Sequence, residues 1–405
     1  MPSQNSSRTS ASWSRRLYLA ALPALGLMAA SAVDSRALAE SFYSAPHHEI
    51  AGRPGSIIRQ EALIGSPPDS TAYRVLYRST GLRGETIAVS GLVIVPNAPA
   101  PIGGRPVVAW AHPTTGIVPH CAPSLANFKF QQMQGLRELL NRGYVVTATD
   151  YPGLGTSGPH PYLVGRSEGY AVLDSIRAAR EVAQTGTIHR AALWGHSQGG
   201  QAVLYAAKLA GSYAPELEIA GVAAAAPATD LGALLNEDMA TPGGKNLLAM
   251  TLWSWSRLFG ASLDGIVDPR AIPTVDRLAE VCLESPIDIR PRARAGRELQ
   301  QRFLLVRNLT ELKPWRTLLA ENTIGALPRE VPVLILQGTN DDTVRPDVTR
   351  RYASRLCANG SRVQLTMMPD VGHGMAAFRG ARSATDWIAQ RFARRPVPSN
   401  CRGGA

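Results

Sequence analysis

The sequence predicts an α/β fold in which helices cover both faces of a mostly parallel sheet and a helical cap is inserted late in the chain. Two observations favour this fold class. Short apolar segments of strand length alternate with segments of helical period over most of the chain. Between residues 231 and 328 this alternation stops, several helical segments follow one another, and the alternation then resumes. An insertion between two strands of one sheet is best explained as a cap over the strand ends.

Each element follows from its local pattern. The apolar run at residues 107–111 has strand length, and residues 168–183 place Val172, Ile176 and Ala179 on one helical face. By the same reasoning, strands are expected at residues 74–79, 86–95, 107–111, 144–149, 191–194, 219–226, 332–337 and 362–368. Helices are expected at residues 133–142, 168–183, 198–210, 346–356 and 380–394.

Residues 1–39 have the features of an export signal. Arg15 and Arg16 form a basic start, an apolar run follows, and Ala37-Leu38-Ala39 matches an A-x-A cleavage signal. The arginine pair also fits a twin-arginine signal, and an ordinary secretory route explains the segment equally well. An uncleaved membrane anchor is the alternative. We therefore expect a secreted or periplasmic protein. The rest of the chain divides into a first core part, the cap and a second core part, at residues 40–230, 231–328 and 329–405.

The composition excludes a disordered or fibrous chain, because 45% of the residues are hydrophobic and 18% are charged. The formal net charge is +11, and about +8 remains once the leader is removed. The positive charges are dispersed and no aromatic residues are interleaved with them, so no nucleic-acid partner is expected. The arginines between residues 290 and 307 are most simply a solvated face.

Four cysteines follow the leader: Cys121, Cys282, Cys357 and Cys401. No two of them form a C-x-x-C pair, so no metal site is expected. An even number of cysteines in an exported protein predicts two disulfides. Of the three pairings, nearness in sequence and placement in the chain favour Cys357 with Cys401 and Cys121 with Cys282. Four buried free thiols are the alternative.

A nucleophile is predicted at Ser197. The segment Gly195-His196-Ser197-Gln198-Gly199 is a G-x-S-x-G sequence between a predicted strand and a predicted helix, which is the context that this motif requires. The glycines allow the sharp turn that raises the hydroxyl above the sheet, and the helix N-terminus favours negative charge there. The alternative is a chance glycine-rich turn, against which the flanking elements argue.

A serine hydroxyl is a weak nucleophile until a base removes its proton, and the base is expected after the last strand. His373 lies there between two glycines, which favours it over the other histidines. The acid is expected after the strand at residues 332–337, where the spacing G-x-x-D-x-x-V selects Asp341. Its neighbour Asp342 and the more distant Asp230 are the alternatives. The order Ser, Asp, His along the chain is that of α/β-hydrolases.

Stabilisation of an oxyanion requires two backbone N–H donors near the serine. Gln198 follows the nucleophile and supplies the first donor. The second is expected from residues 112–116, the loop after the third predicted strand. Pro113 has no N–H, so Thr114 is preferred, with Thr115 as the alternative. A polar turn without this role is the plainer interpretation of the loop.

The predicted cap contains an apolar stretch at residues 247–255. Its simplest interpretation is the core of a helical cap. The alternative is that it lines an acyl pocket or makes transient contact with a lipid surface. The expected substrate is a small-molecule or lipid ester, and the oligomeric state is not predicted.

Several longer segments add to these motifs: HPTTG followed by CAPS, DYPGLG, SEGYAVLDSIRAAR, GHSQGG, GTNDDTV and VGHG. Over about residues 53–401 the chain resembles the secretory lipase family, which includes the A-type yeast lipase and many bacterial relatives. The resemblance implies an α/β-hydrolase fold with a helical cap before the acid, cleavage of carboxylic esters, and a triad at Ser197, Asp341 and His373. The sequence departs from the yeast enzymes at residues 195–199, hereafter the elbow, and in the predicted oxyanion loop at residues 112–116. This leaves both a long-chain lipase and a shorter-chain esterase open.

The expected reaction is hydrolysis of a carboxylic ester through an acyl-enzyme, without a cofactor or metal. An amidase or peptidase with the same triad is the alternative enzyme. A non-catalytic binding protein is the alternative of another class. Dehalogenase and epoxide-hydrolase chemistry is disfavoured, because those sites use an aspartate where this chain has Ser197.

Overall fold

The computed structural model describes residues 42–182, 186–238, 241–283 and 286–401. The chain falls into two units, the first ending at Ser44 and the second beginning at Ala45. Of the first unit only residues 42–44 are described, so the predicted leader lies outside the described residues. Within the described ranges, no helix is both long enough and apolar enough to cross a membrane.

The second unit is built on a sheet that has nine strands in the described part of the chain, in the order β1-β2-β3-β5-β4-β6-β7-β8-β9. The first three pairings in this order are antiparallel and the remaining five are parallel. The strands are β1 Ile57–Ala62, β2 Ser70–Thr80, β3 Thr86–Pro96, β4 Arg105–Ala111, β5 Val145–Thr149, β6 Thr187–His196, β7 Glu218–Ala225, β8 Val333–Gly338 and β9 Val363–Met368. This confirms the predicted α/β fold with a mostly parallel sheet.

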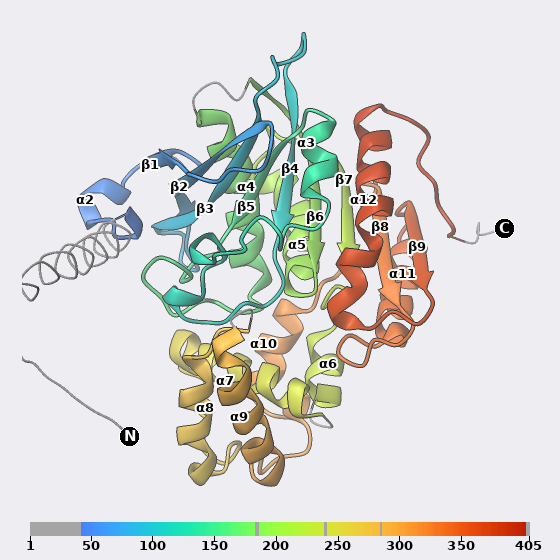
Figure 1. The fold of residues 1–405 in the computed structure, drawn as a ribbon. Coiled ribbons are helices and arrows are strands. Elements are labelled where there is room, and N and C mark those ends of the chain that lie inside the picture. The colour runs from blue at the N-terminus through green and yellow to red at the C-terminus, as the bar shows by residue number, and fades with distance from the viewer. Residues whose placement is uncertain (1–41, 183–185, 239–240, 284–285, 402–405) are drawn as a thin grey trace, which may run out of the picture. The chain divides into compact units, whose positions relative to one another are not determined.

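Helices lie on both faces of the sheet (Figure 1). On one face α4 (Gly165–Glu181) and α5 (Gln198–Tyr213) pack against each other, and on the other α12 (Ala376–Phe392) packs against α3 (Leu136–Asn141). The central strands are buried by this arrangement, and every residue of β5 and β8 is buried. Near the edges of the sheet, α11 (Pro346–Ala358) covers β8 and β9, and the short α2 (His47–Ile50) contacts β3.

Between β7 and β8 the chain leaves the sheet and forms helices that Figure 1 shows beyond the carboxyl ends of the parallel strands. They are α6 Leu231–Asp238, α7 Pro242–Phe259, α8 Ile272–Ala279, α9 Ile289–Gln301 and α10 Trp315–Asn322, hereafter the inserted helices. Their own core includes Trp255 and Trp315, whose rings stack with centroids 6.2 Å apart. Most of the apolar stretch at residues 247–255 is buried in this core, as its simplest interpretation predicts.

Candidate active site

The turn between β6 and α5 holds Ser197 in an unusual backbone conformation. Its φ is 57° and its ψ is −117°, a region that residues with a Cβ avoid. The turn is tight on both sides. A Cβ at Gly195 would lie 2.2 Å from the carbonyl oxygen of Gly199, and one at Gly199 would lie 2.0 Å from that of Ala111. Both glycines are therefore required by close backbone approach, and the serine is raised at the carboxyl edge of the sheet.

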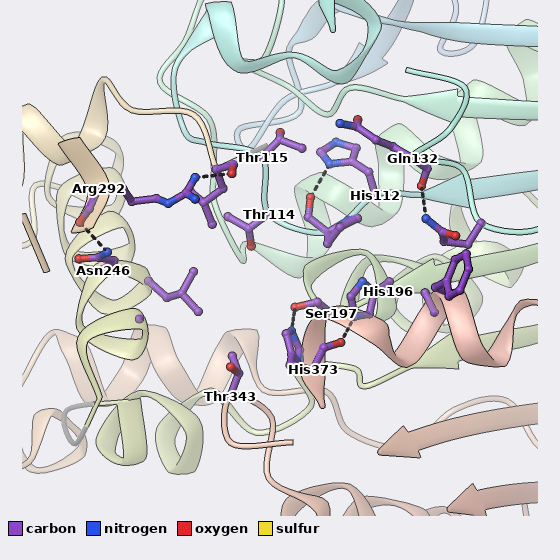
Figure 2. A pocket seen from close by; sticks show the side chains of 18 of the residues that line it. His112, Thr114, Thr115, Gln132, His196, Ser197, Asn246, Arg292, Thr343 and His373 are labelled. Atoms are coloured by element: carbon purple, nitrogen blue, oxygen red, sulfur yellow. Dashed lines mark hydrogen bonds between the residues drawn. The ribbon is translucent and has the colours of Figure 1, made fainter. Parts of the chain in front are cut away.

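Three predicted side chains meet at this turn, and Figure 2 shows two of them, Ser197 and His373. The hydroxyl of Ser197 donates to Nε2 of His373 over 2.8 Å, and Nδ1–H of His373 donates to Oδ2 of Asp341 over 2.9 Å. Each comes from a different connection: Ser197 follows β6, Asp341 follows β8, and His373 follows β9. The structure thus brings the three residues into one hydrogen-bonded chain, although they lie far apart in sequence.

Asp341 differs from the two alternative acids in its surroundings. Its side chain is buried, and Oδ1 accepts hydrogen bonds from the backbone N–H groups of Thr343 and Val344 at 3.0 and 2.8 Å. Asp342 is exposed, and Asp230 accepts from the N–H of Ala233 within α6. Only Asp341 of these three contacts His373.

His196, inside the elbow, supports the site without entering the chain of hydrogen bonds. Its Nε2 lies 3.0 Å from the carbonyl oxygen of His373, and the two imidazole rings are 5.1 Å apart. Burial, together with the nearby His373 ring, lowers the pKa of His196 to about 3. The ring is therefore neutral near pH 7, and its Nε2–H donates to the backbone of His373.

The predicted oxyanion donors come from two segments, the start of α5 and the loop after β4. Gln198 is the first residue of α5, so its backbone N–H has no carbonyl one turn earlier to bind. Thr114 and Thr115 are buried in the loop after β4 and line the same cavity as Ser197. The hydroxyl of Thr114 is within 2.9 Å of that of Tyr162, and the carbonyl of Thr115 accepts from the N–H of Leu283 over 2.7 Å.

The cavity at Ser197 has a volume of about 370 Å³. The sheet side contributes Trp110, Ala377 and Phe378, and the inserted helices contribute the opposite wall with Asn246 and Leu247. Arg292, on α9, also lines this wall; its guanidinium donates to the carbonyl oxygens of Cys282 and Leu283. The interpretation of this arginine as part of a solvated face is therefore wrong, because it is half-buried and lines the cavity (Figure 2).

The cysteines form two disulfides, Cys121–Cys282 and Cys357–Cys401, in the pairing that the sequence favoured. The first joins the loop after β4 to the inserted segment close to Leu283. His120 lies beside Cys121 and Cys282, but sulfur atoms held in a disulfide do not act as thiolate ligands. Across the described ranges, this is the one group of three or more ligand-type residues close enough to hold a metal ion.

Sequence reasoning missed the environment of the Gln198 side chain. It turns into the interior and contacts Glu168 and His160, both fully buried. The segment SEGYAVLDSIRAAR contains Glu168, but its helical pattern carries no sign that a carboxyl group approaches the elbow. The position of Arg292 in the cavity wall was also missed, because the sequence does not distinguish it from the other arginines between residues 290 and 307.

Comparison with known proteins gives four informative similarities. The family model described as secretory lipase matches residues 125–400. Lipase 10 of Candida albicans is 27% identical over 393 residues, covering 89% of this chain and 82% of that protein. A Mycobacterium tuberculosis protein named as a probable inactive lipase is 31% identical over 209 residues, covering 48% of this chain and 46% of its own. The closed-state structure of Candida antarctica lipase A has the same fold, with a TM-score of 0.73 at 20% identity over 89% of this chain and 87% of that one.

Proposed function

Because this chain belongs to the secretory lipase family and is a carboxylic ester hydrolase, we propose that Ser197, His373 and Asp341 are its catalytic triad. The observation that carries the proposal is the continuous hydrogen-bonded chain from the Asp341 carboxylate through the His373 imidazole to the Ser197 hydroxyl. In such a chain a neutral imidazole can remove the hydroxyl proton as the oxygen attacks, while the carboxylate holds the histidine tautomer.

The first half of the reaction forms the acyl-enzyme. Oγ of Ser197 bonds to the ester carbonyl carbon, its proton passes to Nε2 of His373, and the carbonyl electron pair moves onto oxygen. When this tetrahedral intermediate collapses, the bond to the alcohol oxygen breaks and that oxygen takes the proton from His373. Asp341 stabilises the imidazolium that exists between these two proton transfers.

The second half releases the acid. Nε2 of His373 takes a proton from a water molecule as its oxygen attacks the acyl carbonyl. Collapse of the second intermediate breaks the bond to Oγ of Ser197, which regains its proton from His373. Both intermediates carry an oxyanion, and the backbone N–H groups of Gln198 and Thr114 are the proposed donors to it, with Thr115 as the alternative second donor.

The inserted helices are proposed to act as a cap that forms the substrate-binding wall, with the cap spanning residues 231–328. Asn246, Leu247 and Arg292 support this role, because they line the cavity opposite Ser197. A cavity of about 370 Å³ is small among ligand sites, which hold roughly 300–1,000 Å³. We therefore assign the chain to esters with short to medium acyl chains, with triacylglycerols of that kind among them.

Transient contact with a lipid surface is part of the proposal. Four large apolar side chains that line the cavity or a neighbouring one are exposed: Leu125, Phe128, Ile287 and Phe378. Phe378 lines the cavity itself, while Phe128 and Ile287 line a neighbouring one that shares Thr115 and Gln132 with it.

A double substitution, Phe128→Ser with Ile287→Ser, tests this contact. It is expected to weaken adsorption to phospholipid vesicles and turnover of emulsified ester, and to leave turnover of a dissolved short-chain ester unchanged. Ile102→Ser is the control, because Ile102 is fully exposed and does not line the cavity. Equal adsorption of all three proteins would refute the contact.

Secretion follows from the family. The finer proposal is that export removes residues 1–39 by cleavage after Ala39 and delivers the chain to the periplasm or the exterior. The N-terminal sequence of the exported protein tests it, since a first residue other than Glu40 would contradict the cleavage site.

Hydrolysis of p-nitrophenyl esters from acetate to palmitate, by the mature protein and by its Ser197→Ala variant, tests the function as a whole. Loss of the nucleophile is expected to lower kcat by at least about 10³-fold for every ester. Turnover by the parent protein is expected to be greatest with short to medium chains. Unchanged turnover by the variant would reject the triad, and a maximum at palmitate would reject the chain-length assignment.

A further inference from the structure

Glu168 is a fully buried carboxyl group that the proposed reaction does not use. It lies in the first turn of α4, and its Oε1 accepts the backbone N–H of Leu163 over 2.9 Å and the side-chain amide of Gln198 over 2.7 Å. Its Oε2 is buried and has no hydrogen-bond partner among the residues that the structure describes. The carboxyl group is therefore hydrogen-bonded to Gln198, the residue that follows the proposed nucleophile.

The protons of this cluster can be assigned from its partners. Nδ1 of His160 lies 2.8 Å from the carbonyl oxygen of Pro152, which can only accept, so Nδ1 carries the hydrogen. Nε2 of the same ring must then accept, and its partner at 2.8 Å is the amide nitrogen of Gln198. The two amide hydrogens of Gln198 are thus shared between Glu168 and His160, which fixes the orientation of the side chain.

The second oxyanion donor rests on the same part of the chain. The hydroxyl of Thr114 is hydrogen-bonded to that of Tyr162, two residues after His160 and six before Glu168. Residues 160–168 therefore hold both residues that are proposed to donate to the oxyanion. Tyr162 binds Thr114, and Glu168 binds Gln198. Because an oxyanion donor acts only when it is aimed at the developing charge, the rigidity of this anchor bears on the rate.

No cation faces Glu168 within the described part of the chain. The titratable groups around it are His160, Tyr151 after β5, and Tyr205 on α5. Burial lowers the pKa of His160 to about 3 and raises the pKa of both tyrosines, so all three are neutral near pH 7. Burial also raises the pKa of Glu168 to about 8, against the opposing effect of its two hydrogen-bond donors.

We propose that Glu168 is a positioning residue for ester hydrolysis, which in its neutral form anchors the Gln198 side chain and so aims the backbone N–H of Gln198 at the oxyanion. This inference rests on the proposed function, because it assigns Gln198 as an oxyanion donor. It extends that function to a residue outside the cavity. Ionisation of Glu168 places an uncompensated negative charge behind the site where the oxyanion forms, and in a dry interior such charges repel strongly. Turnover is therefore limited at alkaline pH by Glu168.

The test is the pH profile of kcat and KM for a dissolved short-chain ester, with Glu168→Gln compared with the parent protein. Glutamine keeps the shape and the acceptor oxygen but cannot ionise. For the parent protein, kcat is expected to fall about tenfold between pH 7 and pH 9, since about a tenth of Glu168 stays neutral one unit above its pKa. The variant is expected to keep its kcat over this range, and KM is expected to change in neither protein.

Asp174→Asn is the matched control, because Asp174 is another buried acid of α4 whose partners are Ser79, Tyr213 and Arg177 rather than the elbow. It should keep the alkaline fall. An alkaline fall of equal size in Glu168→Gln, or none in the parent protein, would overturn the proposal. Neither result would affect the triad, which is tested separately by Ser197→Ala.

A second measurement covers the case in which Glu168→Gln does not fold. The infrared spectrum of the parent protein is expected to lose the C=O stretch of one protonated carboxyl group as the pH rises through about 8. If no carboxyl group titrates there, Glu168 is not held neutral and the proposal is wrong.

Discussion

Ser197 occupies a backbone region whose cost is about 1–2 kcal/mol for a residue with a Cβ. Its neighbours hold it there: its N–H donates to the carbonyl of Ala225 over 2.9 Å, and its own carbonyl accepts from Gln201 and Ala228. The cost is therefore offset by bonds from β7, α5 and the segment after β7. The surrounding structure therefore holds the proposed nucleophile in position.

Asp341 and Asp342 offer a matched pair for testing the acid. Asp341→Asn is expected to lower kcat by about 10³–10⁴-fold with little change in KM, because the amide favours the wrong histidine tautomer. Asp342→Asn removes an exposed charge one residue away and is expected to keep kcat close to that of the parent. The measurement is steady-state turnover of both variants on one ester. A large loss in Asp342→Asn with none in Asp341→Asn would reverse the assignment.

Glu168 gives a prediction for stability. The native state holds its proton up to about pH 8, whereas the unfolded chain releases it near the usual value of 4.5. The native state binds more protons than the unfolded chain in this interval. The contribution of Glu168 to the free energy of unfolding is therefore fully present below about pH 4.5 and is lost as the pH rises through 8. The free energy of unfolding of the parent, relative to Glu168→Gln, is expected to fall by about 1.4 kcal/mol per pH unit. Urea unfolding of both proteins between pH 5 and pH 8 measures this slope, and parallel curves would contradict it.

Among individual residues, the sequence predicts the site residues that directly follow a strand. It misses the polar residues whose neighbours depend on how helices pack. Ser197, Asp341 and His373 each follow a strand, and parallel strands end at one edge, so their meeting is foreseeable. Glu168 and Arg292 lie within helices, where the pattern of apolar residues gives the buried face but not the neighbour that a polar side chain reaches. Only the packing of α4 on α5, and of α9 over the cavity, reveals those contacts.

Helix α5 allows the requirement for glycine at the elbow to be separated from helix propensity. Gly199→Ala places a Cβ against the carbonyl oxygen of Ala111 and is expected to abolish activity and lower the melting temperature. Gly211 lies in the last turn of the same helix, and a Cβ there would contact nothing within 4 Å. Gly211→Ala is therefore expected to stabilise the protein by about 0.5–1 kcal/mol. Thermal unfolding and turnover of both variants test whether glycine is required at position 199. If Gly199→Ala kept its activity and its melting temperature, the turn could relax to accommodate a Cβ.

Helices and strands in which apolar residues recur at a regular spacing are predicted well, and those without such a pattern are missed. Strand β1 has the sequence IIRQEA and is only partly buried at the sheet edge, so no alternating or apolar pattern marks it. Helix α12 begins at Ala376 rather than at the predicted residue 380. Gly374 precedes the helix and Gly380 lies near its start, and glycines usually indicate a helix boundary. Gly380 lies inside the helix, where a Cβ would approach Leu336 of β8 to 2.6 Å. A glycine used for close helix–strand packing is thus easily taken for a helix boundary.

At the scale of the whole molecule, the two disulfides are expected to have different effects. Cys121–Cys282 joins the segment after β4 to the stretch between α8 and α9, beside the hydrogen bond from Leu283 to Thr115. Its removal by Cys121→Ser with Cys282→Ser is expected to lower both stability and kcat. Removal of Cys357–Cys401, which ties the C-terminal segment to α11, is expected to lower stability alone. Each loss of stability should be about 2–5 kcal/mol. Turnover of the two folded double variants tests this, and equal kcat values would deny the first disulfide any role at the site.

The proposed mechanism requires Ser197 as the nucleophile, and covalent trapping tests this most directly. The mature protein would be treated with an alkyl fluorophosphonate, whose phosphorus is attacked by the oxygen of an activated serine with loss of fluoride. It would then be digested and analysed by mass spectrometry. One adduct is expected, on the peptide that contains Ser197, with loss of turnover in proportion to labelling and no adduct in Ser197→Ala. Labelling of another serine, or full turnover by a protein labelled at Ser197, would contradict the proposed mechanism.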